Sequence, residues 1–233
     1  MGASLRLGRV FGIPIEVNIS WILVFLLLTY LLAGQFDDSH QRWSSTQRWS
    51  VAMITVVLLF LSVLAHELSH SVMALSKGIP VRGITLFIFG GVSRLDREPE
   101  RPLTEFVVAL VGPLLSLVLA VILGVAWYLM GRGDSAVGAV LYLLAWTNLS
   151  LGVFNLVPGY PLDGGRLLRA GIWGLTGNNH KATQIAAGMG QVVGSAMVMG
   201  GVLLAVFSEP VDGVWLGLVG IFLFSMARNS FPK

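Results

Sequence analysis

Long apolar stretches alternate with short polar segments along the whole of this 233-residue sequence. An apolar stretch of about 18 or more residues with few charges is typical of a helix that crosses a membrane. We predict such helices at residues 18–34, 49–76, 103–130, 136–156, 182–207 and 214–227. A short amphipathic segment, residues 1–14, precedes the first of them. The expected fold class is therefore an all-α polytopic membrane protein, with residues 1–233 forming a single domain.

The pattern changes between the second and third predicted helices. Residues 81–89 are rich in β-branched and aromatic side chains, and Gly90 and Gly91 can reverse the chain before a second short strand at residues 92–95. We therefore expect a short β-hairpin at residues 81–95. An open strand edge of this hairpin can pair with an extended segment of another chain. The hairpin can equally act only as a plug, and the sequence leaves both interpretations open.

The composition agrees with a membrane protein and narrows the chemistry. Hydrophobic residues make up 55% of the chain and charged residues only 12%, whereas a soluble domain carries about a quarter charged residues. The net charge of +3 is not gathered into a basic block with interleaved aromatic residues, so we expect no nucleic-acid partner. Because the chain has no cysteine, a transition metal would have to be held by His, Asp or Glu.

The distribution of basic residues predicts the orientation in the membrane. Six crossings place both termini on one side, and the segments on that side hold 12 of the 15 Lys and Arg residues. The other side holds Arg42, Arg48 and Arg132. Loops rich in Lys and Arg stay in the cytoplasm. We therefore expect a multi-pass protein of the cell's inner membrane with both termini in the cytoplasm.

The second predicted helix contains the sequence His66-Glu67-Leu68-Ser69-His70. Residues four apart lie on one helix face, so His66 and His70 can bind one metal ion, and Glu67 is placed to take a proton from a water molecule activated by that metal. A charged residue at the centre of a membrane helix costs about 2.5–3.5 kcal/mol on insertion scales, so it is rarely found there without a role. We therefore favour a metal site over an internally satisfied polar cluster.

A third ligand is expected, because catalytic zinc usually has three protein ligands. His40 and His180 fall in predicted loops, and most acidic residues fall in outer loops or in the charged connector after the hairpin. Glu16 and Glu105 occupy the first turns of predicted helices, where a helix N-terminus favours negative charge. Asp163 remains. It follows the fourth helix, which runs in the same direction as the second, so both can meet in the inner leaflet; the alternative is a solvated aspartate in a plain turn.

The segment around Asp163 is expected to be irregular. Prolines and glycines interrupt the helical pattern between residues 156 and 166, at Pro158, Gly159, Pro161, Gly164 and Gly165. Irregular backbone near membrane depth occurs only where it is buried in protein or lines a watery cavity. Residues 167–181 are then a moderately polar return to the fifth predicted helix.

A second motif follows the first by two helices: Asn155-Leu156-Val157-Pro158-Gly159-Tyr160-Pro161-Leu162-Asp163-Gly164-Gly165. Together the two motifs resemble those of the site-2 protease family of intramembrane zinc metalloproteases. The resemblance implies one Zn²⁺ per chain, with His66, His70 and Asp163 as its ligands. It also implies Glu67 as the catalytic base and Asn155 as a group that holds the substrate carbonyl or its oxyanion.

The resemblance covers the six-helix layout and implies a function. It is to the compact six-span type without a PDZ domain, since the segment from Lys77 to Pro102 is too short for one. The implied activity is that of a zinc-dependent endopeptidase that cleaves peptide bonds in or near transmembrane segments of membrane proteins, within the lipid bilayer. The implied substrate is a single-span membrane protein such as an anti-sigma factor.

One departure and two alternatives accompany this interpretation. The family often has Asn in the third helix shortly after a Gly-Pro pair, where this chain has Ser116. A metal-ion transporter also carries polar ligands inside membrane helices, although it would have no need of Glu67 beside His66. A catalytically inactive scaffold is the other alternative.

Overall fold

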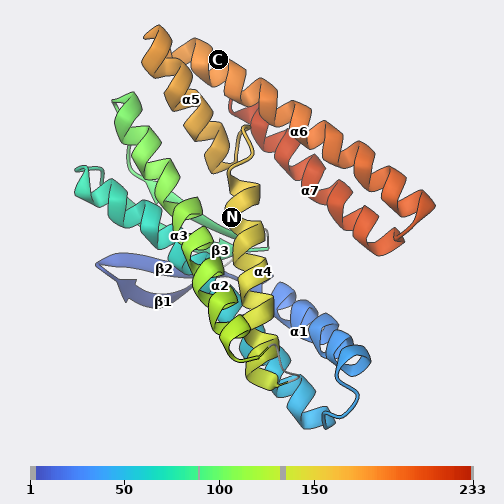
Figure 1. Cartoon of the computed structure of the whole chain (residues 1–233). Helices are drawn as coiled ribbons and strands as arrows, with labels where there is room; N and C mark the ends of the chain where they lie inside the picture. Colours follow the sequence, from blue (N-terminus) through green and yellow to red (C-terminus); the bar gives the residue numbers. More distant parts are fainter. Residues whose placement is uncertain (1–3, 89, 132–134, 232–233) are drawn as a thin grey trace. The chain divides into compact units, whose positions relative to one another are not determined.

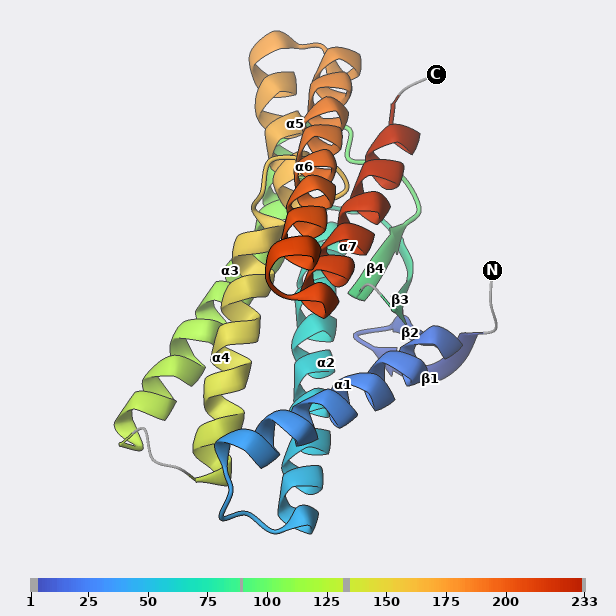
Figure 2. The same ribbon diagram turned by 90° about the vertical axis from the view of Figure 1, so that its right-hand side faces the viewer.

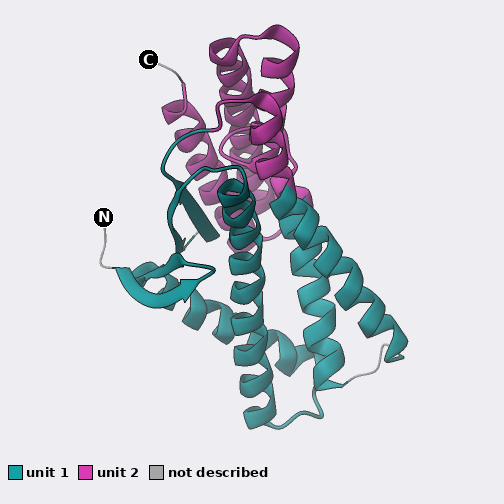
Figure 3. Cartoon of the chain, turned by 90° about the vertical axis from the view of Figure 1, so that its left-hand side faces the viewer, with its two compact units in different colours: residues 1–98, 111–152 teal, residues 99–110, 153–233 magenta. Residues whose placement is uncertain are grey.

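The computed structural model of the chain describes residues 4–88, 90–131 and 135–231 (Figure 1). Along these residues the order of elements is β1 (Ser4–Val10), β2 (Ile13–Asn18), α1 (Ile19–Ser39), α2 (Ser45–Ser76), β3 (Val81–Phe87), β4 (Gly90–Leu95), α3 (Pro102–Leu129), α4 (Ala136–Asn155), α5 (Asp163–Thr176), α6 (Asn179–Phe207) and α7 (Pro210–Asn229). Two compact units are formed, one by residues 1–98 and 111–152 and the other by residues 99–110 and 153–233 (Figure 3).

Six helices in the described part of the chain are long and apolar enough to cross a membrane: α1, α2, α3, α4, α6 and α7. This confirms the six predicted transmembrane helices. The polar segment between the first two is shorter than expected, because α1 continues to Ser39 and α2 begins at Ser45. The Ser44 side chain caps α2 by accepting a hydrogen bond from the backbone N–H of Gln47 (3.2 Å). Polar residues thus extend both helices beyond their apolar parts.

A four-stranded sheet joins the N-terminal segment to the predicted hairpin. Its strand order is β1-β2-β3-β4, with β2 and β3 parallel and the other neighbours antiparallel (Figure 2). The hairpin itself is confirmed, although β3 ends at Phe87, and Gly90 and Gly91 lie in β4 rather than in the turn; position 89 lies outside the described residues. Because β3 is paired on both sides, the open edge of the hairpin belongs to β4.

The segment predicted as a short amphipathic entry forms strands instead: β1 and β2 precede α1, which begins at Ile19. In β2, Ile13, Ile15 and Val17 are buried and the residues between them are half-buried, which is the two-residue period of a strand. Glu16 therefore lies in β2, and not in the first turn of α1 as predicted. The alternation is present in the sequence, but it is only six residues long and is followed at once by the apolar run of α1.

Glu16 is held by arginines from two other strands. Its carboxylate accepts hydrogen bonds from Arg6 of β1 (3.3 Å) and from Arg94 of β4 (2.7 Å). Burial by itself would raise the pKa of the Glu16 carboxyl, but the hydrogen bonds and charges of Arg94 and Arg6 outweigh burial and lower the pKa below its ordinary value of 4.5. The ion pairs therefore tie β2 to both outer strands of the sheet.

The sheet is anchored on α1 and α2 by an apolar core. Its buried residues come from β2 and β3, and half-buried residues of both helices and of β3 pack on them: Ile13, Ile15, Val17, Ile84 and Leu86, with Trp21, Val63, Leu64, Leu68 and Val81. Leu68 belongs to the histidine motif of α2. The packing of the sheet therefore extends to the turn of α2 that carries the candidate metal ligands.

The second unit contains a helix that the sequence did not predict. α5 begins at Asp163 and ends before Gly177, which adopts a left-handed conformation (φ 69°) typical of a helix C-terminus. Our expectation of an irregular segment up to residue 166 was thus wrong for its last residues, because Gly164 and Gly165 lie in the first turn of this helix. A Cβ atom at Gly164 would meet the carbonyl groups of Leu156 and Val157. Glycine here permits close backbone packing rather than breaking the helix.

Helices α6 and α7 form an antiparallel pair whose backbones approach closely (Figure 1). A Cβ atom at Gly194 would lie 2.7 Å from the Phe224 nitrogen, and one at Gly201 would lie 2.6 Å from both Gly213 O and Gly217 N. Small residues of this kind allow the close approach by which membrane helices gain van der Waals contact.

Candidate metal centre

Two buried histidine side chains lie one turn apart on the same face of α2. His66 and His70 are 3% and 8% exposed, and their Nε2 atoms are 3.2 Å apart. Two nitrogens that bind one zinc ion tetrahedrally, each at about 2.0–2.1 Å, are separated by about 3.3 Å. Two Nε2 lone pairs facing each other at this distance would repel unless a proton or a cation lies between them. The pair therefore fits two ligand positions of a zinc site.

The helix α3 supports this histidine pair at two positions one turn apart. The Ser116 hydroxyl is fully buried and lies 2.9 Å from Nδ1 of His66. When that Nδ1 carries the proton and donates it to Ser116, the lone pair of Nε2 is left for a metal. A Cβ atom at Gly112 would clash with the His70 ring and lie 2.9 Å from Nε2 of His66. The α3 backbone therefore lies directly against the histidine pair.

Ser116 is a site residue that sequence reasoning missed. The family often has Asn at this position, and because this chain has serine instead, the sequence alone assigned the position no role. The available signal was its spacing from Gly112, because residues four apart share a helix face, but nothing in the sequence pairs that face with His66. The structure supplies the pairing through a contact between residues 50 positions apart.

The carboxylate of Glu67 is held by the edge strand of the sheet. Its Oε2 accepts a hydrogen bond from the backbone N–H of Ser93 in β4 (3.1 Å). A Cβ atom at Gly91 would lie 2.5 Å from Cγ of Glu67, so glycine is required for the strand to pass at this distance. One turn further along α2, the hydroxyls of Ser71 and Ser93 are 2.7 Å apart. The hairpin is thus fastened beside the histidine motif.

Asn155 and Asp163 belong to the second unit, at the two ends of the proline-rich loop. Asn155 is the last residue of α4 and Asp163 the first of α5. Within this unit the loop is seated on α6, because the backbone N–H of Tyr160 donates to the Ala186 carbonyl (3.1 Å). A Cβ atom at Gly190 of α6 would clash with the Tyr160 carbonyl. The backbone between the two candidate residues is therefore fixed by α6.

A buried ion pair fastens α5 to the start of α3. Arg169 donates from Nε and from one terminal nitrogen to Oε1 of Glu105, each at 2.7 Å, and the two side chains are only 7% and 3% exposed. The Arg169 guanidinium also lies over the Tyr160 ring, 5.8 Å from its centroid. Glu105 does occupy the first turn of its helix, as predicted, and its carboxylate pairs with Arg169 of α5.

The remaining histidines take no part in the buried pair. His40 follows the end of α1, where its ring packs against Phe36 and Trp43. His180 is exposed in the first turn of α6.

Comparison with known proteins places the chain in a family. The sequence matches Peptidase family M50 over residues 54–133 and 130–200. The chain belongs to this family. It is 42% identical to "Putative zinc metalloprotease sll0528" of Synechocystis sp. over 100% of this chain and 62% of that protein, and 38% identical to "Putative zinc metalloprotease Rip3" of Mycobacterium tuberculosis over 98% and 59%. The M50 chain thus spans about three fifths of the length of these relatives.

A solved structure gives the fold of this M50 protein. The chain is similar to the structure titled "Site-2 Protease from Methanocaldococcus jannaschii", with a TM-score of 0.68 and 32% sequence identity, over 99% of this chain and 96% of that chain. The resemblance to site-2 proteases and the fold class expected from the sequence are both confirmed. The names of the relatives also agree with zinc as the metal of the family.

Proposed function

We propose that this protein is a zinc-dependent intramembrane endopeptidase that cleaves peptide bonds in or near transmembrane segments of other membrane proteins. The observation that carries the proposal is the buried pair His66 and His70, with Nε2 atoms 3.2 Å apart in an apolar helix of a member of family M50. Glu67 adjoins the first histidine, as hydrolysis requires. A transporter would need the ligands but not this carboxylate, and family membership speaks against that alternative.

We assign one Zn²⁺ to His66, His70 and Asp163. Support for Asp163 comes from the match of its motif to the family pattern and from the elimination of the other acidic residues, in which Glu16 is now set aside by its hydrogen bonds to Arg6 and Arg94. Bound zinc supplies Lewis-acid polarisation of the scissile carbonyl and acidifies a water molecule. Asp163 begins a helix whose glycines and loop are tightly packed in their own unit, and a metal ligand benefits from such a fixed backbone.

The chain's own residues then carry the proton and the charge. The Glu67 carboxylate takes one proton from the attacking water and delivers it to the leaving amide nitrogen as the carbon–nitrogen bond breaks. The Asn155 side-chain amide donates a hydrogen bond to the oxyanion that forms on the former carbonyl oxygen. Removal of one such donor costs about 2.7–4 kcal/mol of transition-state stabilisation in other hydrolases.

A transmembrane substrate has to unwind before it can be cut, since a helix satisfies its own backbone hydrogen bonds. The open edge of β4 lies beside Glu67 and offers main-chain groups with which an unwound segment can pair. The alternative, in which the hairpin only plugs the site, predicts that β4 substitutions raise rather than lower cleavage. The substrate we propose is a single-span membrane protein of the anti-sigma-factor type.

The same proposal includes the placement of the protein in the cell. With 12 of the 15 basic residues on the side of the termini, the inner membrane with cytoplasmic termini is the arrangement that the positive-inside rule favours. A water path to the metal would then open from the cytoplasmic side.

The deciding experiment is the substitution Glu67→Gln in the purified protein. We expect it to retain zinc, because the histidine pair is unchanged, and to lose cleavage of a co-reconstituted single-span substrate. His66→Ala serves as the contrasting variant and should lose both zinc and cleavage, whereas Ser69→Ala in the same turn of α2 should lose neither. Substantial residual cleavage by Glu67→Gln would overturn the proposed mechanism.

A further inference from the structure

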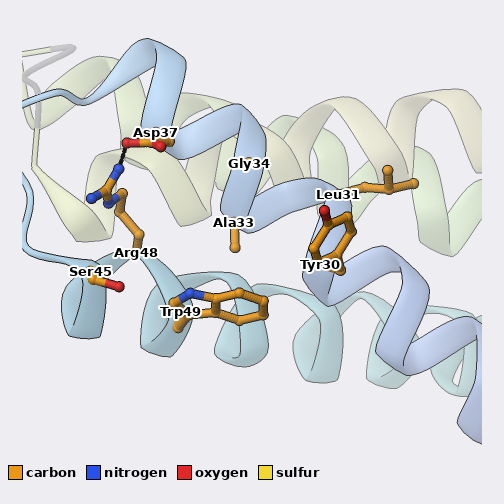
Figure 4. Close-up of a pocket in the computed structure, with 8 residues that line it drawn as sticks. All are labelled: Tyr30, Leu31, Ala33, Gly34, Asp37, Ser45, Arg48 and Trp49. Carbon is orange, nitrogen blue, oxygen red and sulfur yellow. Dashed lines mark ion pairs between the residues drawn. The ribbon is translucent and has the colours of Figure 1, made fainter.

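A pocket of about 280 Å³ lies between the end of α1 and the start of α2, far from the histidine pair (Figure 4). Trp49 in its wall and His66 are 17 positions apart in α2, or about 25 Å at 1.5 Å per residue. Pockets for drug-sized ligands have volumes of about 300–1,000 Å³, so this one suits a smaller group. It is not explained by peptide hydrolysis.

One end of the pocket presents two opposite charges. Asp37 of α1 and Arg48 of α2 form an ion pair there, with side-chain exposures of 66% and 20%. An exposed carboxylate retains free acceptor positions, and a guanidinium has five N–H donors, more than one carboxylate can use. Ser45, the first residue of α2, lies beside Arg48 in the lining (Figure 4), where the partial positive charge of the helix N-terminus adds to that of the arginine.

The rest of the lining consists of two aromatic residues, Tyr30 and Trp49, with Leu31, Ala33 and Gly34. The rings of Tyr30 and Trp49 are 6.2 Å apart between centroids, and Figure 4 shows them on either side of the space next to Ala33. Aromatic faces attract cations, and Tyr and Trp are enriched at the level of lipid headgroups. Leu27 and Leu31 on α1 and Met53 on α2 continue from this end as exposed apolar side chains, a surface suited to acyl chains.

We propose that this pocket binds the headgroup of a phospholipid that carries a primary ammonium, of which phosphatidylethanolamine is the probe. The phosphate pairs with Arg48, and the ammonium donates to the free acceptor positions of Asp37 beside the two rings. A choline headgroup has no N–H to donate, and a glycerol headgroup has no cation for the carboxylate and the rings. The position of the pocket at the end of two membrane helices places it at headgroup depth. This inference does not depend on the protein's being a protease.

The test measures retention of lipids by the purified full chain in detergent, using native mass spectrometry with equal amounts of phosphatidylethanolamine, phosphatidylcholine and phosphatidylglycerol. The wild type should retain phosphatidylethanolamine preferentially. Asp37→Asn should lower the retention of phosphatidylethanolamine by roughly tenfold, to the level of the other two lipids, so that the preference is lost. Arg48→Gln should lower the retention of all three phospholipids by roughly tenfold. A tenfold change is expected for the loss of one charge-assisted hydrogen bond. Asp38→Asn and Arg42→Gln, exposed neighbours outside the pocket lining, are the matched controls and should behave as wild type.

Three results would overturn the proposal: equal retention of the three lipids by the wild type, the same loss in the control variants, or binding of soluble glycerophosphoethanolamine as tight as that of the diacyl lipid. The last would identify a site for small soluble phosphoesters. If Arg48→Gln does not fold, as judged by its melting profile, Asp37→Asn and Arg48→Lys decide the matter. The lysine keeps the charge and should therefore retain phosphatidylethanolamine better than Asp37→Asn.

Discussion

The buried pair Glu105–Arg169 should be among the most sensitive positions in the second unit. Arg169→Met removes the two 2.7 Å hydrogen bonds to Oε1 of Glu105 and leaves a carboxylate that is only 3% exposed. Breaking a buried ion pair by removing one partner costs about 3–5 kcal/mol, because the other charge is left without compensation. Glu105→Gln should cost less, since the amide oxygen can still accept from the arginine.

The double variant Glu105→Leu with Arg169→Met shows whether that cost comes from the unpaired buried carboxylate or from the loss of the ion pair itself. Replacing both members of a buried pair by apolar residues is often neutral or stabilising, so we expect the double variant to recover most of the stability lost by Arg169→Met. Equilibrium unfolding in mixed micelles measures the free energies of unfolding of Glu105→Leu, of Arg169→Met and of the double variant, and hence the coupling between the two positions. Arg166→Met, a half-buried arginine one turn earlier in α5, is the matched control.

Zinc content provides a second readout on the same proteins. Because Asp163 is the first residue of α5, loosening this helix should lower zinc occupancy in Arg169→Met more than in Arg166→Met. A cost below about 1 kcal/mol for Arg169→Met, as found for exposed ion pairs, would refute the reasoning. So would a double variant whose loss equals the sum of the single losses.

Three further predictions concern other parts of the chain. Ser116→Ala should lower zinc affinity by about 10–100-fold in metal competition titrations, the usual effect of losing a partner of a ligand histidine, and an unchanged affinity would exclude this role. Gly190→Ala should displace the loop on α6 and reduce both melting temperature and zinc content, whereas Gly188→Ala, where a Cβ meets nothing within 4 Å, should change neither. The fold lowers the Glu16 pKa, so the stabilisation by this carboxylate is complete above the ordinary value of 4.5 and is lost as the pH falls through the folded-state pKa. Hydrogen exchange of the sheet amides should become faster over this pH range. In Glu16→Gln this pH dependence should be absent.

The elements that the sequence predicted well are those governed by local pattern. An apolar run long enough to cross a membrane has few alternatives, and two histidines four residues apart share a helix face in any α-helix. The hairpin at Val81–Leu95 was likewise indicated by its β-branched residues and glycines. The ligand role of Asp163 stays a prediction, since it rests on the motif and on elimination.

The elements that were missed depend on contacts between distant residues. The sequence did not predict α5 because Gly164 and Gly165 are poor helix formers. These glycines allow close backbone packing against the preceding loop, a contact that appears only in the folded chain. Glu105 and Arg169 are 64 positions apart, and no local pattern pairs them. The strand β2 was visible in its alternation, but its stability comes from pairing with β3, which is far along the chain.

The hydrogen bond between Ser93 and Glu67 also bears on how this protein avoids unwanted association. An edge strand exposes main-chain donors that can recruit another strand and start aggregation. In β4 one such donor is already used by a carboxylate of the same chain, so a strand arriving at random gains nothing at that position and has to displace a charged acceptor. The net gain from one hydrogen bond is only about 0.5–1.5 kcal/mol. The Glu67 carboxylate therefore protects the open edge of β4 from non-specific strand pairing. Only a segment that makes enough further contacts along β4 can displace this carboxylate from Ser93.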